Sequence, residues 1–289
     1  MKTIVIGASG LVGQNLLREF SALGETLGTC HSQIQSELTP LDLADPAQIE
    51  KIIGEFRPDV VLLPAAMTNV DLCEEKPELS RQINVDGTAA VARAARKLDA
   101  RLVYISTDYV FDGTAGPYGE DATPNPINHY SRHKLEAENV VRETVPHHLI
   151  LRTSSVYGWE RLGKNFVLQL LRRFRAGEKP RVFSDQYGSP TYAPNLAEVI
   201  RELVERRATG LFHAGGMSWV NRVELAMEVA RGFGIINAAL DIVTSAQVVQ
   251  KARRPLRGGL RMEKMHGVIR GRMLTLPEGL ARMKREESE

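Results

Sequence analysis

The sequence has little of several features that mark particular classes of protein. Its two cysteines, Cys30 and Cys73, cannot build a disulfide framework or a metal cluster, which favours a reducing compartment. The longest apolar run, residues 60–67, is much shorter than the ~20 residues that cross a bilayer. The net charge of +2 is too balanced for a dedicated nucleic-acid binder, and the first residues show no signal-peptide pattern. We therefore expect a cytoplasmic protein without membrane or nucleic-acid partners.

The composition and the order of segments predict an α/β protein. Hydrophobic residues make up 43% and charged residues 25%, which are ordinary globular values and exclude a disordered or fibrous chain. At ~150 residues per domain, the 289 residues allow two domains or one large α/β unit. Strand-like and helix-like segments alternate up to about residue 152, and this order predicts a parallel sheet with helices on both faces.

A glycine-rich turn close to the start of the sequence has the spacing of a phosphate-binding loop. Residues 3–6 are predicted to form a strand, and a helical pattern of apolar residues follows Gly7, Gly10 and Gly13. Gly7 permits a tight turn, Gly10 lets the backbone approach a pyrophosphate, and Gly13 lets the helix pack closely on the strand. This context favours a dinucleotide site over a plain glycine turn, and its further contacts would be Ser9, Leu11 and Val12.

These observations together predict a Rossmann-type, doubly wound parallel sheet. Residues 1–155 are expected to form the dinucleotide-binding domain, including the helix that carries the candidate catalytic residues described below. Residues 156–289 should form mainly a smaller, substrate-binding lobe over the carboxyl ends of the strands, with some segments returning to the core sheet.

The residues after the second strand bear on the choice of dinucleotide. A strand is predicted over residues 25–29, and His31 and Ser32 follow it. No acid occupies the place that usually holds the ribose 2′-hydroxyl of NAD. His31 and Ser32 are suited to accept a 2′-phosphate, so the sequence favours NADPH, with NADH as the other option. The alternative is that both residues are solvated loop residues.

Three residues are candidates for the chemistry. Tyr130 and Lys134 stand four residues apart in a helix predicted over residues 128–144, so they share one face. A phenol with an ordinary pKa of about 10 is a poor acid or base at neutral pH unless a nearby cation stabilises its ionised form. The spacing alone is common by chance. However, Thr107 ends a predicted strand and is placed to hydrogen-bond the same substrate oxygen; Ser106 is the runner-up, on the opposite face of that strand.

Longer motifs surround these three residues. They are residues 106–113, the segment from Pro124 to Glu138 and the Asp-Gln-x-Gly-Ser-Pro-Thr run at 185–191, supported by residues 65–71 and 84–88 and by the GxxGxxG spacing of the glycine turn. With these motifs the sequence resembles the dTDP-4-dehydrorhamnose reductase family, of the extended short-chain dehydrogenase/reductase type. The resemblance is strong over residues 1–200 and fainter to about residue 280. It implies hydride transfer from NAD(P)H to the 4-keto carbon of a nucleotide-linked 6-deoxysugar, in dTDP-L-rhamnose biosynthesis.

The resemblance also implies roles for individual residues. Tyr130 would protonate the developing alkoxide and Thr107 would orient the carbonyl oxygen. Lys134 would lower the pKa of Tyr130 and position the nicotinamide ribose. The other cofactor contacts implied are Asp42, Leu43, Ala65, Ala66 and Thr68. The substrate contacts implied are Thr68, Val70, Thr107, Asp108, Tyr109, Ser155, Asn165, Gln186, Thr191 and Arg254, although loop structure is an equal alternative for Asn165, Gln186 and Thr191.

The sequence departs from the family pattern in places that bear on the substrate. Ser155 stands where family members commonly carry Trp, and Gly258 and Gly259 follow Arg254 where an Asn-Ser pair is typical. Residues 251–272 contain eight Lys or Arg and one acid, which suits a diphosphate but also a solvated basic face. Gln14 and Asn15 replace acids that bind a bridging magnesium ion in some relatives, so no metal is expected. A homodimer through other helices stays open.

Two other functions stay open at this stage. One is a non-catalytic, dinucleotide-binding regulatory subunit like the beta subunit of methionine adenosyltransferase, which resembles this family. The other is a different nucleotide-sugar reductase or an epimerase. Retention of Thr107, Tyr130 and Lys134 favours an enzyme.

Overall fold

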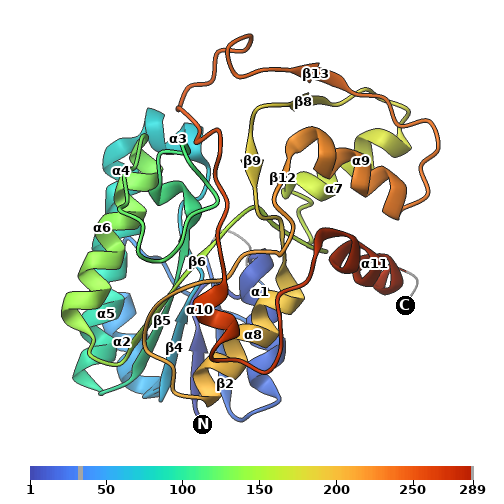
Figure 1. The fold of residues 1–289 in the computed structure, drawn as a ribbon. Helices are drawn as coiled ribbons and strands as arrows, with labels where there is room; N and C mark the ends of the chain where they lie inside the picture. Colours follow the sequence, from blue (N-terminus) through green and yellow to red (C-terminus); the bar gives the residue numbers. More distant parts are fainter. Residues whose placement is uncertain (32–34, 288–289) are drawn as a thin grey trace.

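A seven-stranded parallel sheet forms the centre of the molecule. The computed structural model describes residues 1–31 and 35–287 (Figure 1), so the prediction for Ser32 lies outside the described residues. The strand order is β11-β6-β5-β4-β1-β2-β3, and every pairing is parallel. The bounds are β1 Thr3–Val5, β2 Thr26–Cys30, β3 Thr39–Pro40, β4 Val60–Leu63, β5 Arg101–Thr107, β6 His148–Thr153 and β11 Gly210–His213.

Helices cover both faces of this sheet (Figure 1). Helices α1 and α8 pack together on one face, and α2, α5 and α6 lie side by side on the other. The strand β4 shows why both faces must be covered: Val60 and Leu62 belong to the first core, whereas Val61 and Leu63 belong to the second. The predicted doubly wound, Rossmann-type sheet is therefore confirmed. The bounds are α1 Leu11–Ser21, α2 Pro46–Phe56, α5 Gly87–Lys97, α6 His129–Thr144 and α8 Ala193–Glu205.

An interrupted helix extends over residues 77–97. It consists of α4 (Pro77–Arg81), a π-helical turn at Gln82–Asp86 and α5, and it follows a short helix, α3 (Val70–Glu75). The side-chain amide of Asn84, within the π turn, accepts from Met67 N (2.8 Å) and donates to Met67 O (3.1 Å). The wide turn thus holds the loop that follows β4, at the carboxyl edge of the sheet.

A smaller lobe lies beyond that edge and has its own apolar core. Its helices are α7 Phe166–Arg175, α9 Arg222–Gly232 and α11 Leu276–Glu286. Its short strand pairs are β7 Val156–Tyr157 with β10 Thr191–Tyr192, β9 Tyr187–Gly188 with β12 Val220–Asn221, and β8 Arg181–Phe183 with β13 Asp241–Val243. Strand β11 and helix α8, together with the short α10 (Glu263–His266), return to the sheet domain instead.

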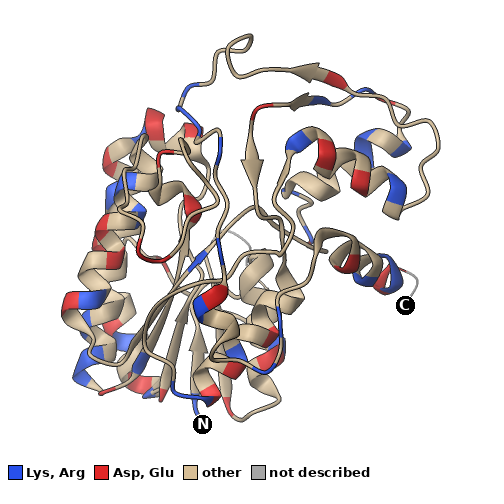
Figure 2. Ribbon diagram, viewed as in Figure 1, with Lys and Arg blue, Asp and Glu red and all other residues tan. Residues whose placement is uncertain are grey.

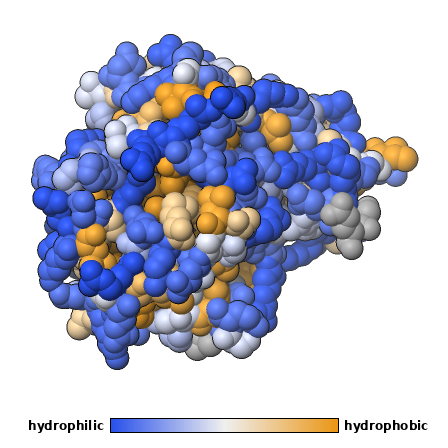
Figure 3. Space-filling view, turned by 90° about the horizontal axis from the view of Figure 1, so that it is seen from below, coloured by the Kyte–Doolittle hydropathy of each residue, from blue (hydrophilic) through white to orange (hydrophobic). Residues whose placement is uncertain are grey.

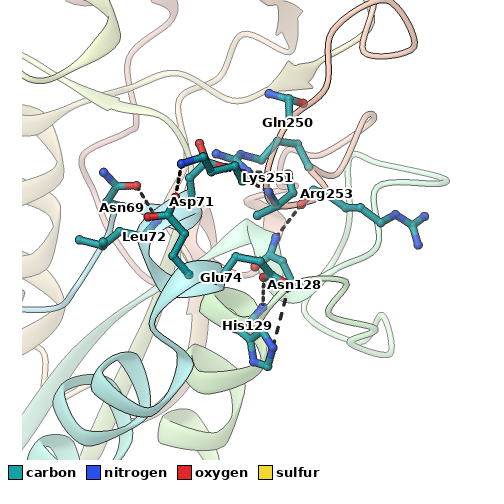
Figure 4. Close-up of polar contacts among 12 residues, drawn as sticks. Asn69, Asp71, Leu72, Glu74, Asn128, His129, Gln250, Lys251 and Arg253 are labelled. Carbon is teal, nitrogen blue, oxygen red and sulfur yellow. Dashed lines mark hydrogen bonds and ion pairs between the residues drawn. The ribbon is translucent and has the colours of Figure 1, made fainter.

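Residues 250–261, which we call the strap, connect the two parts (Figures 1 and 4). The Asp71 carboxylate accepts from Arg254 Nη1 (2.9 Å) and from the backbone N of Ala252 (3.1 Å), and Lys251 pairs with Glu75. Further along, backbone hydrogen bonds join the strap to the loop after β5 and to β9. Two acids of α3 therefore form ion pairs with basic residues of the segment 251–272 (Figure 2).

The face seen from below is mostly hydrophilic, and its apolar side chains form separate small groups (Figure 3). Within the described residues, no helix has both the length and the apolar character that a membrane span requires.

Candidate active site

In the glycine turn, the backbone lies very close to neighbouring atoms. Gly7 has φ +95°, and a Cβ there would lie 2.7 Å from the Cβ of Ala65. A Cβ on Gly13 would lie 2.0 Å from the carbonyl oxygen of Gly7. Gly10 precedes α1, whose N-terminus has no side-chain cap and no acid in its first turn. Ser9 lies within the turn, and Leu11 and Val12 begin the helix. These residues fit the phosphate groups of a dinucleotide, because free N–H groups meet no competing acid.

The residues predicted to contact the adenosine half lie at the ends of β2 and β3. His31 Nε2 is 3.6 Å from the Asp42 carboxylate, and both side chains are largely exposed. Leu43 is buried beneath Gly87, where a Cβ would lie 2.5 Å from the Leu43 carbonyl oxygen. A carboxylate therefore lies beside His31 after all, contributed by the segment after β3 rather than by the end of β2.

The loop after β4 forms the next part of the carboxyl edge. Ala65 and Ala66 are half-buried, Thr68 is exposed, and Val70 begins α3 after the Asn69 cap. The Asn84 amide fixes this loop through Met67. The small side chain of Ala65 lets this loop pack directly against Gly7 of the glycine turn.

The three candidate catalytic residues come together at the carboxyl end of β5. Asn128 and Ser131 form a capping box that fixes the first turn of α6, and this places Tyr130 and Lys134 against the end of β5. Tyr130 is 9% exposed, with its ring edge-on to Tyr109 at 6.3 Å.

Lys134 is fully enclosed beside Tyr130. Its ammonium donates to the carbonyl oxygen of Ile105 (2.7 Å) and lies 4.1 Å from the centre of the Tyr104 ring.

The electrostatics of Tyr130 differ from the sequence-based expectation. Burial raises the pKa of Tyr130 above its ordinary value, and the Thr107 hydroxyl opposes this because it favours the phenolate. Burial also lowers the pKa of Lys134, to about 7. The structure therefore does not show the expected lowering of the Tyr130 pKa by Lys134, because burial of the phenol raises that pKa. Tyr130 is held as a protonated phenol, which is the form that a proton donor needs.

Ser106, the runner-up to Thr107, is used elsewhere. Its hydroxyl donates to Glu138 (2.5 Å), whose carboxylate also binds Arg152 through two bonds of 2.9 and 2.7 Å. This pair was missed from the sequence, because Arg152 lies on β6, 14 residues after Glu138, and no helical spacing joins the two. Thr107, whose hydroxyl accepts from Tyr109 N (3.2 Å), stays the candidate.

Asp108 is buried rather than open to a substrate. Its Oδ2 accepts from Ser154 Oγ (2.6 Å) and from Gly259 N (3.1 Å). Burial raises the pKa of Asp108, and these hydrogen bonds and the charge of Arg222 oppose the rise. A Cβ on Gly258 would lie 3.1 Å from the same oxygen. The departure at Gly258 and Gly259 thus lets the strap close over Asp108.

Four predicted substrate contacts form hydrogen bonds or ion pairs within the protein. Asn165 caps α7, accepting from Leu168 N and donating to Gly158 O. The Thr191 hydroxyl is fully buried, donates to Ser154 O and accepts from Gly216 N.

The other two residues, Gln186 and Arg254, form side-chain contacts that fix the strap and the segment before it. Gln186 donates to Ser245 Oγ and Gln250 Oε1 (both 3.0 Å), and Arg254 pairs with Asp71. The ligand roles of Asn165, Gln186, Thr191 and Arg254 stay predictions, and in this structure all four side chains have partners within the protein.

Ser155 lies at a cavity of the smaller lobe. The cavity has a volume of about 190 Å³ and is lined by Ser155, Val156, Tyr157, Phe166, Val167, Arg222 and Leu225. The sequence analysis did not identify Arg222 as a site residue. The available signal was the Asn221-x-x-Glu224 capping box, which places Arg222 on the first turn of a helix.

The described residues contain no group of three or more His, Cys, Asp or Glu side chains that could hold a metal ion.

A glycine turn on a doubly wound parallel sheet, with Thr107, Tyr130 and Lys134 at its carboxyl edge, defines the short-chain dehydrogenase/reductase class. Within that class, the chain belongs to the RmlD substrate binding domain family, which it matches over residues 1–288.

Individual relatives support this assignment. The chain is 34% identical over 275 residues to dTDP-4-dehydrorhamnose reductase of Salmonella typhimurium, covering 91% of this chain and 90% of that protein. It is 32% identical over 255 residues to methionine adenosyltransferase 2 subunit beta of Xenopus tropicalis, covering 86% and 76%. The crystal structure of dTDP-4-dehydrorhamnose reductase from Bacillus anthracis in complex with NADP superposes with a TM-score of 0.88, at 30% identity and coverage of 99% and 98%.

Proposed function

We propose that this protein is an NAD(P)H-dependent reductase of the 4-keto group of a nucleotide-linked 6-deoxysugar, with dTDP-4-dehydrorhamnose as the first candidate substrate. The observation that carries the proposal is the meeting of Thr107, Tyr130 and Lys134 at the carboxyl end of β5, on the edge of the sheet where the glycine turn also lies. The Salmonella and Bacillus relatives, which are reductases by name, support it.

Each residue of the proposed site has a separate role in the reaction. A bound nicotinamide cofactor would supply the hydride. Tyr130 donates a proton to the substrate oxygen, and Thr107 hydrogen-bonds the same oxygen and orients it. Lys134 lies one helical turn after Tyr130 and would hold the nicotinamide ribose. The residues that would hold the cofactor are Gly7, Ser9, Gly10, Leu11, Val12, Gly13, His31, Asp42, Leu43, Ala65, Ala66 and Thr68; Val70, Tyr109 and Ser155 would face the sugar.

The second candidate function is that of a non-catalytic partner subunit, which the likeness to methionine adenosyltransferase 2 subunit beta favours. A subunit that only binds dinucleotide has no need of a buried phenol beside a buried ammonium. The intact trio therefore favours turnover. A homodimer stays a prediction, which light scattering on the purified protein would test.

One assay separates these functions. The purified protein is mixed with NADPH and, in turn, with a panel of nucleotide-linked 4-keto-6-deoxysugars, and the absorbance of the reduced nicotinamide is followed. We expect depletion with one or few members of the panel, dTDP-4-dehydrorhamnose first among them. Binding of NADPH without depletion by any sugar would support the partner-subunit function and contradict the reductase.

We also predict that NADPH raises the melting temperature more than NADH does at equal concentration. The exposed His31 ring, which lies 3.6 Å from the Asp42 carboxylate, would contact a 2′-phosphate, and tighter binding to the folded state gives a larger shift. Thermal shift assays with both cofactors check this. In His31→Ala the difference between the cofactors should shrink, whereas Asp42→Asn should enlarge it by removing a negative charge from the phosphate. Equal shifts in the wild type would show that His31 does not bind the phosphate.

A further inference from the structure

A single guanidinium group lies in the cavity beside Ser155. Arg222 is the first residue of α9, and the capping box of Asn221 and Glu224 fixes the start of that helix. The backbone N of Arg222 donates to Gln186 O (3.1 Å), and its guanidinium carbon lies 4.6 Å from the centre of the Phe166 ring. The Arg222 side chain is therefore held in place at the cavity wall.

The charge of Arg222 is not neutralised by a contact. Among residues 1–31 and 35–287, no carboxylate lies within ion-pair distance of Arg222. The Glu224 carboxylate accepts from Asn221 N (2.8 Å) in the capping box. The buried Asp108 carboxylate, which accepts from Ser154 and Gly259, interacts with Arg222 electrostatically but makes no ion pair with it. The remaining wall of the cavity is apolar or carries hydroxyl groups. Such a site selects an anionic ligand, because guanidinium groups bind phosphate oxygens in pairs.

The cavity adjoins the candidate catalytic residues. Thr153, at the end of β6, pairs with Thr107 at the end of β5, and Ser155 follows two residues later. The volume of about 190 Å³ is smaller than the ~300–1,000 Å³ of pockets that enclose whole ligands. The cavity is therefore suited to one part of a larger ligand whose reacting carbon lies at Thr107 and Tyr130.

Three other basic residues of the strap already have partners. Arg254 is paired with Asp71 and Lys251 with Glu75. Figure 4 shows Asp71 and Lys251 at the junction of the strap with α3. The Arg257 guanidinium stacks on the rings of Tyr187 and Trp219, at 5.5 and 5.0 Å.

We propose that Arg222 binds the diphosphate of the nucleotide-linked substrate in the cavity between β7, α7 and α9. This inference rests on the proposed function for the identity of the substrate, but it is tested separately from turnover. It assigns the phosphate contact to the smaller lobe, where the sequence had suggested the basic strap.

The test measures the affinity of the nucleoside diphosphate dTDP by calorimetry. Arg222→Gln should weaken dTDP binding about 10–100-fold, the scale of lost charge-assisted hydrogen bonds, and Arg222→Lys should recover part of the loss. The matched control is Arg231→Ala, because Arg231 lies on the same helix and is exposed in a pair with Glu228. The control should bind dTDP like the wild type, and all variants should bind NADPH equally.

Each outcome bears on the proposal. An unchanged affinity for dTDP in Arg222→Gln overturns it, as does a wild type that binds no dTDP. A loss of NADPH affinity with dTDP affinity retained overturns it too, because the cavity would then hold the cofactor phosphates. Arg222-dependent dTDP binding without reduction of any sugar supports Arg222 and contradicts the reductase. Reduction of a sugar with an unchanged KM in Arg222→Gln supports the reductase and contradicts the role of Arg222.

Discussion

Replacing Tyr130 with Phe is expected to lower kcat for the 4-keto sugar at least ~100-fold while NADPH still binds, since a positioned general acid is removed. Burial keeps the Tyr130 phenol protonated, with the Thr107 hydroxyl beside it. Phe preserves the ring that packs edge-on against Tyr109, so the fold and the cleft should be retained. Steady-state kinetics with NADPH, together with the thermal shift caused by NADPH alone, measure the two effects.

The control for this prediction is Tyr192→Phe. Tyr192 is another buried tyrosine, but it lies in the core of the smaller lobe. Its hydroxyl can be removed without touching the proposed proton donor, so kcat should stay near the wild-type value. A kcat of Tyr130→Phe within tenfold of the wild type would remove Tyr130 from the proton transfer, and the enzyme would then need another acid at Thr107.

The sheet domain was predictable because its signals are local. The bounds of α2 and β4 agree with the sequence patterns to the residue, since Asp45 and Pro46 mark a helix start and residues 60–63 form a continuous apolar run. The glycine turn and the spacing of Tyr130 and Lys134 are local in the same way. They depend on one strand, one turn and one helix.

The interior roles of polar residues were not predictable, because their partners lie far away in the sequence. Asp108 accepts from Ser154, 46 residues on, and from Gly259, 151 residues on. Asn165 and Thr191 looked like ligands by their place in a motif, but the smaller lobe uses both for backbone hydrogen bonds. The direction of the Tyr130 pKa shift also depends on burial, which residue spacing does not reveal.

Glu138→Ala is expected to lower the free energy of unfolding by about 3–5 kcal/mol, because it leaves the Arg152 guanidinium buried without its counter-ion. Both side chains are buried, at 2% and 0% exposure, and Arg152 Nη1 already lacks a hydrogen-bond partner in the described part of the chain. Urea unfolding measures the loss. Glu136→Ala is the matched control, because Glu136 lies on the same helix in an exposed pair with Arg81, and it should change stability far less.

A double variant separates the ion pair from the packing around it. Glu138→Leu with Arg152→Met removes both charges, so it should recover most of the stability that either single change loses. If the double variant is as unstable as the worse single variant, the pair matters through shape rather than charge. The consequence reaches the site, because Arg152 and Ser106 stand one residue before Thr153 and Thr107. The buried pair thus ties β5, β6 and α6 together directly beneath Tyr130, and variants that break it should lose kcat at temperatures well below their melting points.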